Sequence, residues 1–251
     1  MPIIVTLLTD FGTADGYVAE VKGTILSGAP GVVLIDVAHD LEAQDVEGGR
    51  LALARYWRRF PPGTIHLAVV DPDVGTARRA IAIASDDRYL VGPDNGVLSP
   101  ALLVGGARAV VLAVPTHASP TFHARDVFAP AVAMLASGAT IDALGNPIGD
   151  PVIRRTVEAR RLPGGAIEGR IITVDRFGNA VTNLVAVHGG AIEIGATLLP
   201  IRRTYADVEP GSLVALSGSS GLVEIAVRDG SAAMLLGLRR GGAVLLQPAR
   251  S

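Results

Sequence analysis

The first half of the chain alternates short apolar runs with segments of helical spacing, and this alternation constrains the fold more than any other feature. The apolar runs at residues 3–9, 32–37 and 64–70 predict strands that are covered on both faces. Between them, residues 15–27 and 46–60 carry apolar side chains at helical spacing. Three further strands and one further helix continue the pattern, at residues 80–84, 89–92, 109–114 and 127–136. Strands that alternate with helices predict an α/β domain with a mostly parallel sheet flanked by helices.

The composition changes near residue 145. Residues 147–165 contain three prolines, three glycines and four arginines, and we expect them to link domains at residues 1–146 and 166–251. The second domain is richest in short β-type runs, at residues 166–174, 180–187, 191–198, 213–216, 222–227 and 243–247. Turns containing Gly, Asn or Pro separate these runs, which predicts a smaller antiparallel β-sheet or β-barrel-like domain.

Composition excludes several classes of protein. Of the 251 residues, 49% are hydrophobic and 18% are charged, which is enough apolar surface to bury two cores. The net charge of −2 does not indicate a nucleic-acid partner, and no run of 18 uncharged apolar residues predicts a membrane span. There is no cysteine, which excludes disulfides and thiolate chemistry and fits the reducing cytoplasm.

Three strands of the first domain are predicted to end in an aspartate, namely Asp10, Asp36 and Asp71. In an open parallel sheet, ligands bind beyond the carboxyl ends of the strands, so these carboxylates mark the expected site. Each aspartate could instead cap a helix or fix a turn. That alternative is strong for Asp36 and weaker for Asp10 and Asp71, which directly follow apolar runs. A metal ion bound by all three is a further alternative, although nothing in the sequence requires it.

Two polar segments of the first domain could contribute to such a site. In the loop at residues 71–79, Arg78 lies seven residues after Asp71 and could fold back toward it, although loop arginines are usually surface residues. Residues 121–126 place an aromatic ring, an imidazole and a charged pair directly before a helix. A lone histidine such as His123 is more often structural than catalytic. Residues 93–96 have the signature of a tight turn.

One segment of the second domain also combines chemically useful groups. Asp175, Phe177 and Asn179 offer a carboxylate, a stacking ring and an amide within five residues, which suits an ammonium group or a purine. The alternative is a simple hairpin turn at residues 178–179. Residues 217–221, SGSSG, are typical of a flexible polar loop or an anion-binding nest.

Several common catalytic signatures are missing from the sequence. It contains no P-loop, no GxGxxG fingerprint, no GxSxG nucleophile motif and no HExxH zinc motif. Phosphate-loop nucleotide binding and serine hydrolysis of that type are therefore not expected.

Seven segments spread over nearly the whole chain read, in order, LLTDFGTADGYVAEVKG, IDVAHDLEAQDVEGG, FPPGTIHLAVVDPDVGTARR, VGPDNGVLS, TFHARDVFAPAVAMLA, VDRFGNAVTN and SGSSGLVEIAV. Each alone is a weak signal. In this order they resemble the S-adenosylmethionine hydroxide adenosyltransferase family, relatives of the fluorinase and chlorinase that make 5′-halo-adenosines. The two-domain family fold agrees with the one predicted above.

The resemblance implies an enzyme that attacks S-adenosyl-L-methionine at ribose C5′ with water or hydroxide, giving adenosine and L-methionine without a cofactor or metal. It assigns the holding and activation of the nucleophile to Asp71, Arg78 and His123. Substrate contacts are assigned to Asp10 at the ribose hydroxyls, Phe122, Phe177, Tyr205 and Asn179 around adenine and ribose, and Asp175 and Ser219 at the methionine ammonium and carboxylate. Family members are trimers, with each site between the first domain of one subunit and the second domain of its neighbour.

The sequence departs from the family pattern at two positions, where Asp73 and Ala124 replace common glycines. The halogenases carry tyrosine at the position of Asp71, and the fluorinase lacks a histidine at the position of His123. A carboxylate at position 71 would repel a halide, which favours water as nucleophile. The alternatives are a halide adenosyltransferase, a non-catalytic sensor of S-adenosylmethionine or adenosine, and a metal-dependent hydrolase.

Overall fold

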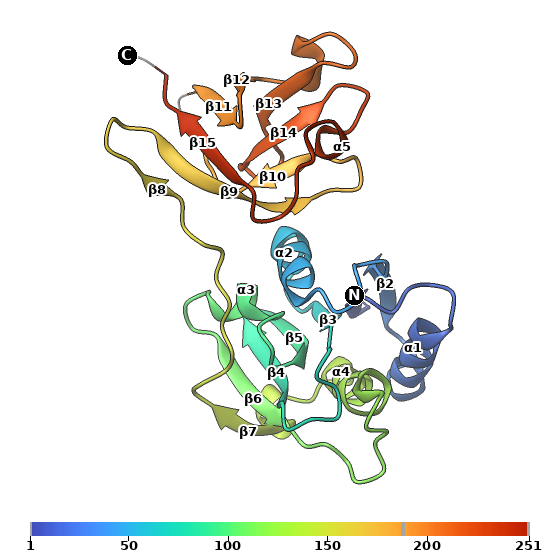
Figure 1. Ribbon diagram of the computed structural model, residues 1–251. Coiled ribbons are helices and arrows are strands. Elements are labelled where there is room, and N and C mark those ends of the chain that lie inside the picture. Colours follow the sequence, from blue (N-terminus) through green and yellow to red (C-terminus); the bar gives the residue numbers. More distant parts are fainter. Residues whose placement is uncertain (1, 187–188, 250–251) are drawn as a thin grey trace. The chain divides into compact units, whose positions relative to one another are not determined.

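The computed structural model describes residues 2–186 and 189–249. The chain forms two compact units, Met1–Arg155 and Thr156–Ser251 (Figure 1). Residues 149–159 belong to no helix or strand, and this stretch contains the boundary between the two units.

A seven-stranded sheet forms the centre of the N-terminal unit. In their order across the sheet, its strands are β2 (Val33–Ala38), β1 (Ile4–Thr9), β3 (Ile65–Val69), β5 (Arg88–Pro93), β4 (Ala80–Ser85), β6 (Arg108–Leu112) and β7 (Gly145–Ile148). The first four run parallel, whereas β4, β6 and β7 join by antiparallel pairing. Because β6 is antiparallel to β4, it runs in the same direction as β5. The predicted mostly parallel sheet is thereby confirmed.

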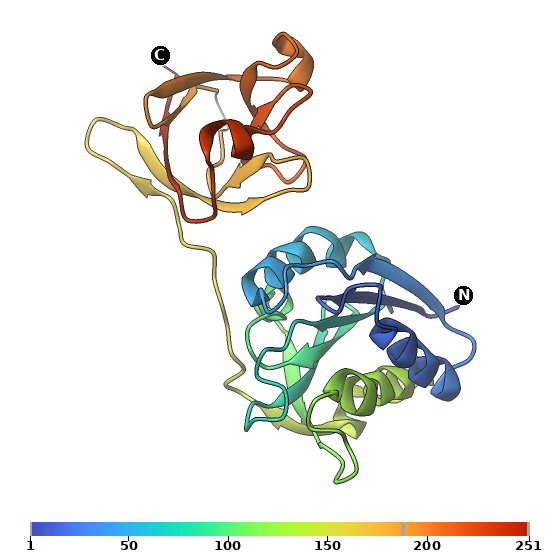
Figure 2. The same ribbon diagram turned by 45° about the vertical axis from the view of Figure 1, so that its right-hand side comes forward.

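Helices cover both faces of this sheet (Figure 2). On one face, α1 (Tyr17–Gly28) and α4 (Ala129–Ala136) bury a core that includes Leu67 of β3. On the other face, α2 (Val46–Tyr56) and α3 (Ser99–Leu102) pack over a core that includes Ala68. Successive residues of β3 therefore point into different cores, which explains why this strand is apolar throughout.

The sheet register brings two of the three predicted aspartates to one edge. Thr9 of β1 pairs with Val69 of β3, so Asp10 and Asp71 follow neighbouring strand ends. Asp36 does not follow this arrangement, because it lies inside β2 opposite Leu7 of β1. The prediction that Asp36 ends its strand was wrong, since pairing continues beyond it to Ala38.

The C-terminal unit is a closed β-barrel. Its ring of strands runs β10 (Ala180–Thr182), β14 (Val223–Val227), β13 (Leu213–Ser217), β12 (Thr197–Arg202), β11 (Ala191–Ile194), β15 (Ala243–Gln247) and β9 (Ile167–Val174). Pairing of β9 with β10 closes the ring, and the two-residue strand β8 (Arg160–Arg161) adds to β9. The pairings around the ring are antiparallel except that of β12 with β13, so the barrel agrees with the predicted domain.

Two details of the barrel differ from the predicted elements. Residues 191–198, predicted as one strand, form the β11–β12 hairpin, because Gly195 takes the left-handed conformation (φ 57°) and turns the chain. The strand predicted at residues 180–187 is the shorter β10, and Val187 at its predicted end lies outside the described residues.

A short helix of the barrel unit, α5 (Ala232–Leu236), was not predicted. Its caps are visible in the sequence, because the Ser231 hydroxyl accepts a hydrogen bond from the Met234 N–H and Gly237 ends the helix in the left-handed conformation. The helix is so short that no apolar periodicity marked it.

The longest helix among the described residues, α1, has 12 residues. In this part of the chain, no helix combines the length and the apolar character needed to cross a membrane.

Candidate active site

Asp71 and Arg78 form a buried ion pair at the carboxyl end of β3. The Arg78 Nε donates to Asp71 Oδ1 at 2.9 Å, and its Nη2 donates to Oδ2, so the pair is bidentate. Only 5% of the Asp71 side chain and 7% of the Arg78 side chain are exposed. A planar fork that bonds both carboxylate oxygens fixes the orientation of both groups. The contact that the loop spacing only suggested is therefore present.

His123 completes this arrangement. The Arg78 Nη2 also donates to His123 Nδ1 at 3.0 Å, so Arg78 connects the carboxylate to the imidazole. His123 directly precedes η2 (Ala124–Phe128), a π-helical turn that leads into α4, and it is 5% exposed. The Arg78 guanidinium carbon also lies 5.4 Å from the centre of the Phe128 ring. The structure thus brings together the three residues to which the family resemblance assigns the nucleophile.

A glycine allows the 71–79 loop to approach the segment before His123. Gly75 has φ 79°, and a Cβ there would lie 2.3 Å from the Pro120 carbonyl oxygen. The Thr76 hydroxyl donates to the Asp73 carbonyl at 2.8 Å, so it serves the turn itself. Asp73 is exposed and contributes its backbone carbonyl to this turn. The aspartate at this position, where the family pattern commonly has glycine, leaves the Asp71–Arg78 pair intact.

The contacts of His123 define its protonation state. A guanidinium can only donate, so Nδ1 accepts from Arg78 and the neutral ring carries its proton on Nε2. Burial, followed by the positive charge of Arg78, lowers the pKa of His123 from its ordinary value, while Asp71 and Asp126 oppose this shift. His123 is therefore neutral at pH 7, with one ring N–H available to a ligand.

Asp10 is held by the backbone of a neighbouring loop. Its Oδ2 accepts a hydrogen bond from the Gln44 N–H at 2.7 Å. Gln44 has φ 68°, an uncommon conformation for a residue with a side chain. This bond occupies one carboxylate oxygen and leaves the other to accept from a ligand hydroxyl.

Three aromatic rings form a cluster. Phe11 directly follows Asp10 in the sequence, and Phe122 directly precedes His123. Phe11, Tyr17 and Phe122 contact one another edge to face, with ring centres 5.4–6.4 Å apart. The Arg125 guanidinium carbon lies 4.9 Å from the centre of the Phe122 ring. The Phe122 ring therefore contacts two aromatic rings and one guanidinium group. Sequence reasoning did not single out Phe11 or Tyr17.

Asp36 belongs to a separate network. Its carboxylate accepts from Lys22 at 2.6 Å and contacts His39 Nε2 at 3.0 Å, while His39 Nδ1 bonds the Thr9 hydroxyl. Within residues 2–186 and 189–249, no cluster of three His, Cys, Asp or Glu side chains is arranged to hold a metal ion. The structure thus does not bring Asp10, Asp36 and Asp71 together as the metal-dependent alternative would require.

The turn at residues 93–96 has a structural role that its sequence did not reveal. Asp94 and Asn95 are only 6% and 7% exposed. Asp94 binds Arg79 at 2.7 Å and accepts from the Val152 N–H, while Asn95 donates to the Val70 carbonyl at 2.8 Å. The turn therefore ties the chain near residue 152 to the edge of the sheet that carries Asp71.

In the barrel unit, the β9–β10 turn carries three predicted site residues. The Asp175 carboxylate accepts from the backbone N–H groups of Phe177 and Asn179 at 2.9 Å and from the Asn179 side chain at 3.0 Å. The Asn179 side chain is buried, whereas Phe177 is 75% exposed. The proposed hairpin turn is present, and it presents an aromatic ring to solvent beside an ordered carboxylate.

Tyr205 and Ser219 occupy other connections of the barrel. Tyr205 begins η4 (Tyr205–Asp207), a 3-10 turn whose capping box is formed by Thr204 and Asp207. Burial, then the charge of Glu224, raises the pKa of Tyr205, and Asp175 adds to this effect. Ser219 lies exposed in the turn between β13 and β14.

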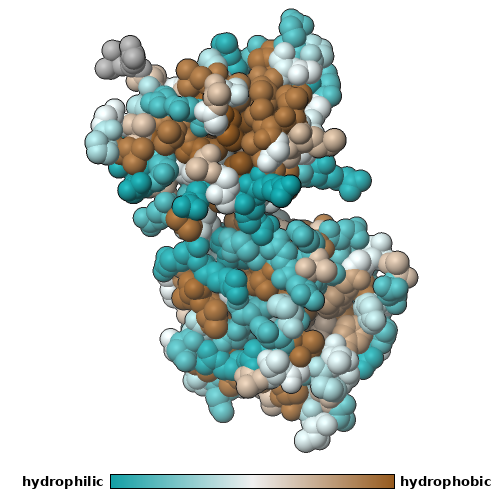
Figure 3. All heavy atoms as spheres, viewed as in Figure 1, coloured by the Kyte–Doolittle hydropathy of each residue, from teal (hydrophilic) through white to brown (hydrophobic). Residues whose placement is uncertain are grey.

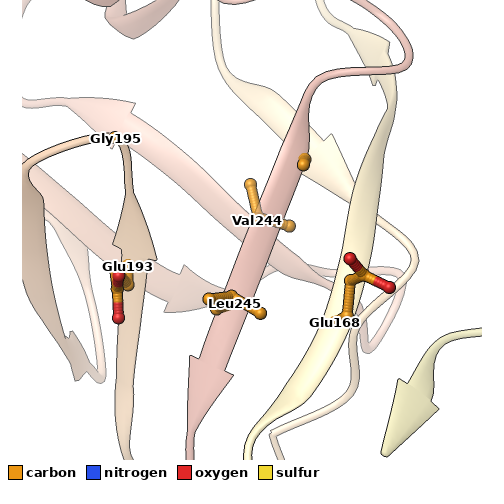
Figure 4. Close-up of a pocket in the computed structure, with 6 residues that line it drawn as sticks. Glu168, Glu193, Gly195, Val244 and Leu245 are labelled. Carbon is orange, nitrogen blue, oxygen red and sulfur yellow. The ribbon is translucent and has the colours of Figure 1, made fainter. Parts of the chain in front are cut away.

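A pocket of about 220 Å³ on the barrel unit is lined by none of the predicted site residues. Figure 4 shows Glu168 and Glu193 on strands either side of Leu245. Both carboxylates have protein partners, because Glu168 binds Arg160 at 2.8 Å and Glu193 binds Gln247 at 3.0 Å. Both carboxylates are therefore already paired within the barrel unit.

Comparisons with known proteins match both units. Residues 5–145 match the N-terminal domain, and residues 169–245 the C-terminal domain, of SAM hydroxide adenosyltransferase. A protein of Thermus thermophilus named (R)-S-adenosyl-L-methionine hydrolase is 44% identical over 96% of this chain and 98% of its own length. A fluorinase of an Actinoplanes species is 30% identical over 72% of this chain and 71% of its own.

A solved structure agrees with this relationship. The crystal structure of an uncharacterised conserved protein from Thermotoga maritima superposes with a TM-score of 0.87 at 30% identity, covering 97% of this chain and 99% of that chain. The fold, the two matched domains and the relatives therefore lead to one conclusion: the chain belongs to the S-adenosylmethionine hydroxide adenosyltransferase family.

Proposed function

We propose that this protein hydrolyses S-adenosyl-L-methionine by attack of water or hydroxide on ribose C5′, releasing adenosine and L-methionine. The observation that carries the proposal is the buried Asp71–Arg78–His123 array, which is formed entirely within the N-terminal unit. The relatives named as hydrolases of this compound support the choice of substrate.

The reaction requires little acid assistance from the protein. A C5′–O bond forms as the C5′–S bond breaks, and the electron pair of the broken bond stays on sulfur, which leaves as a neutral thioether. When water attacks, its extra proton is released to the solvent. The main task is to hold the oxygen in line with the C5′–S bond, and such positioning accounts for about 7–11 kcal/mol in favourable cases.

The geometry supports a separate task for each of the three side chains. Arg78 supplies the positive charge that stabilises a hydroxide, and Asp71 fixes the plane of its guanidinium. Because Nδ1 of His123 already accepts from Arg78, the ring donates its Nε2–H to the nucleophile. His123 therefore orients the oxygen in this arrangement, and its own proton stays on the ring.

We further propose that the protein acts in the cytoplasm as a homotrimer, with each site shared between the first domain of one subunit and the second domain of its neighbour. The candidate residues support this division, since Asp10 and the array lie in one unit and Asp175 and Tyr205 in the other. Exposed apolar side chains on the barrel unit, where hydrophobic atoms gather on the visible face (Figure 3), suit a subunit contact.

Mixing two impaired variants tests the shared site, at a substrate concentration far below KM where each variant alone has little activity. His123→Ala removes a group from the first domain and Asp175→Ala removes one from the second. If each site combines domains of two subunits, a reassembled equal mixture contains intact sites at roughly a quarter of positions. Recovery of activity supports sharing, whereas a mixture as inactive as its components contradicts it. Sedimentation equilibrium of the wild-type protein then tests the trimer.

Product identification tests the activity itself. The purified protein is incubated with S-adenosylmethionine, with and without chelator and with added chloride, and the products are separated by mass spectrometry. We expect equal amounts of adenosine and methionine, unaffected by chelator. A chlorinated nucleoside would instead identify a halide adenosyltransferase, loss of activity with chelator a metal-dependent hydrolase, and intact substrate a non-catalytic sensor.

A further inference from the structure

Glu224 is a carboxylate buried on the outer face of the barrel. It pairs with Leu216 of β13 and Val181 of β10, and it is 6% exposed. By the alternation of β14 it shares a face with Ala226, which packs with Val214 and Leu216 in a small apolar cluster. A charged group in such surroundings lowers stability unless it is well hydrogen-bonded, so its presence calls for a function.

The hydrogen-bond partner of Glu224 is Tyr205. The Tyr205 hydroxyl donates to Glu224 Oε2 at 3.2 Å, while 39% of Tyr205 remains exposed. Burial, followed by the negative charges of Glu224 and Asp175, raises the pKa of Tyr205, which keeps its hydroxyl protonated and able to donate. This hydrogen bond fixes the hydroxyl end of the Tyr205 side chain, and the exposed part of the side chain can contact a ligand.

The backbone leaves room for this carboxylate at one position. A Cβ on Gly218 would lie 1.9 Å from Glu224 Oε1. Gly218 begins the turn that carries Ser219, and its N–H donates to the Leu222 carbonyl at 2.8 Å. Glu224 therefore lies between the Tyr205 ring and the loop of Ser219, two elements to which substrate contacts are assigned.

We propose that Glu224 is a positioning residue for substrate binding, which holds the Tyr205 ring against the nucleoside of the substrate. The inference rests on the proposed function, because it requires that Tyr205 contact the bound nucleoside. Glu224 itself touches no reacting atom. Its loss therefore weakens binding and leaves the chemical step in the N-terminal unit unchanged.

Steady-state kinetics with S-adenosylmethionine test this role. Glu224→Leu fits the apolar face and removes the acceptor, and we expect KM to rise about tenfold with kcat within about twofold of wild type. Glu224→Gln keeps an oxygen that accepts from Tyr205 and should restore most of the affinity. Gly218→Ala should raise KM as Glu224→Leu does, because its Cβ displaces the carboxylate without changing Glu224.

A double variant shows whether Glu224 acts through Tyr205. In a Tyr205→Phe background, Glu224→Leu should raise KM by less than about twofold, since the hydrogen bond is already absent. Glu193→Leu is the matched control, because Glu193 is also a barrel-strand glutamate but bonds Gln247. A wild-type protein that releases no adenosine would overturn the proposed function. If the wild type is active, two results would overturn this inference. One is a KM for Glu224→Leu equal to that of Glu193→Leu, and the other is an additive effect of Glu224→Leu and Tyr205→Phe on KM.

Discussion

The two units present their candidate residues in different ways. In the N-terminal unit, side chains bond to side chains, because Arg78 reaches both Asp71 and His123 and all three are buried. In the barrel unit, Asp175 bonds mainly to its own turn, and Phe177 stands 75% exposed. The N-terminal unit thus fixes its three candidate side chains against one another, whereas the barrel unit exposes its aromatic ring to solvent.

This difference agrees with a division of labour between the units. A group that acts on charge developing in the transition state must be oriented before the reaction, and burial with bidentate bonding achieves this. A surface that binds an aromatic ring and an amino acid gains from exposed groups that the ligand itself covers. Changes in the N-terminal array should therefore alter kcat, whereas changes in the barrel turn should alter KM.

The largest effect should follow from loss of Arg78. Arg78→Ala removes the positive charge and the link between Asp71 and His123, and we expect kcat to fall by about 10²–10³-fold. It also leaves the buried Asp71 unpaired, which costs about 3–5 kcal/mol of stability, so Arg78→Lys is measured beside it. Steady-state kinetics and thermal unfolding separate the two effects. Arg108→Ala, at an exposed pair with Asp142, is the control, and equal kinetics for Arg78→Ala and this control would refute the assigned role.

The next effect should appear in the pH dependence. The pKa of His123 lies below its ordinary value of about 6.5, so its neutral form, which accepts from Arg78, persists below that pH. Activity should be constant on the alkaline side and should fall about tenfold per unit once the pH drops below the lowered pKa. The measurement is kcat/KM from pH 4 to 8. A fall whose midpoint lies above 6.5 would contradict the arrangement, and His123→Asn should remove the step.

A smaller effect should follow from loss of Phe177. Stacking of an aromatic ring on a base contributes about 1–3 kcal/mol, so Phe177→Ala should raise KM by about fivefold or more while kcat stays near wild type. Stability should change little because the ring is 75% exposed. Steady-state kinetics with a melting curve measure both. Should kcat fall and KM stay constant, the contrast between the two units would not hold.

Sequence reasoning worked where local pattern and topology combine. Asp10 and Asp71 could be placed at one edge because parallel neighbouring strands end together, and the register of β1 with β3 bears this out. Asp36 was misplaced because its strand continues through the apolar residues that follow it. A strand end is visible in a sequence only when turn residues mark it.

Contacts between distant segments could not be read from spacing. Arg78 meets His123, 45 residues further along the chain, where Gly75 lets the Arg78 loop approach Pro120, and the spacing of these residues does not reveal that approach. The same holds for Glu224, because the sequence shows only that it lies in a strand, and not that it accepts a hydrogen bond from Tyr205. In both cases, the residues became candidates through their partners and their burial.

The position of isotopic oxygen in the product tests the central claim most directly. Wild-type protein is allowed to react with S-adenosylmethionine in ¹⁸O-water, and the adenosine is fragmented to locate the label. Our account predicts one ¹⁸O atom at the 5′ oxygen in every molecule formed, because the nucleophile attacks C5′ as the bond to sulfur breaks. Adenosine without the label, or a label elsewhere in the nucleoside, would contradict it.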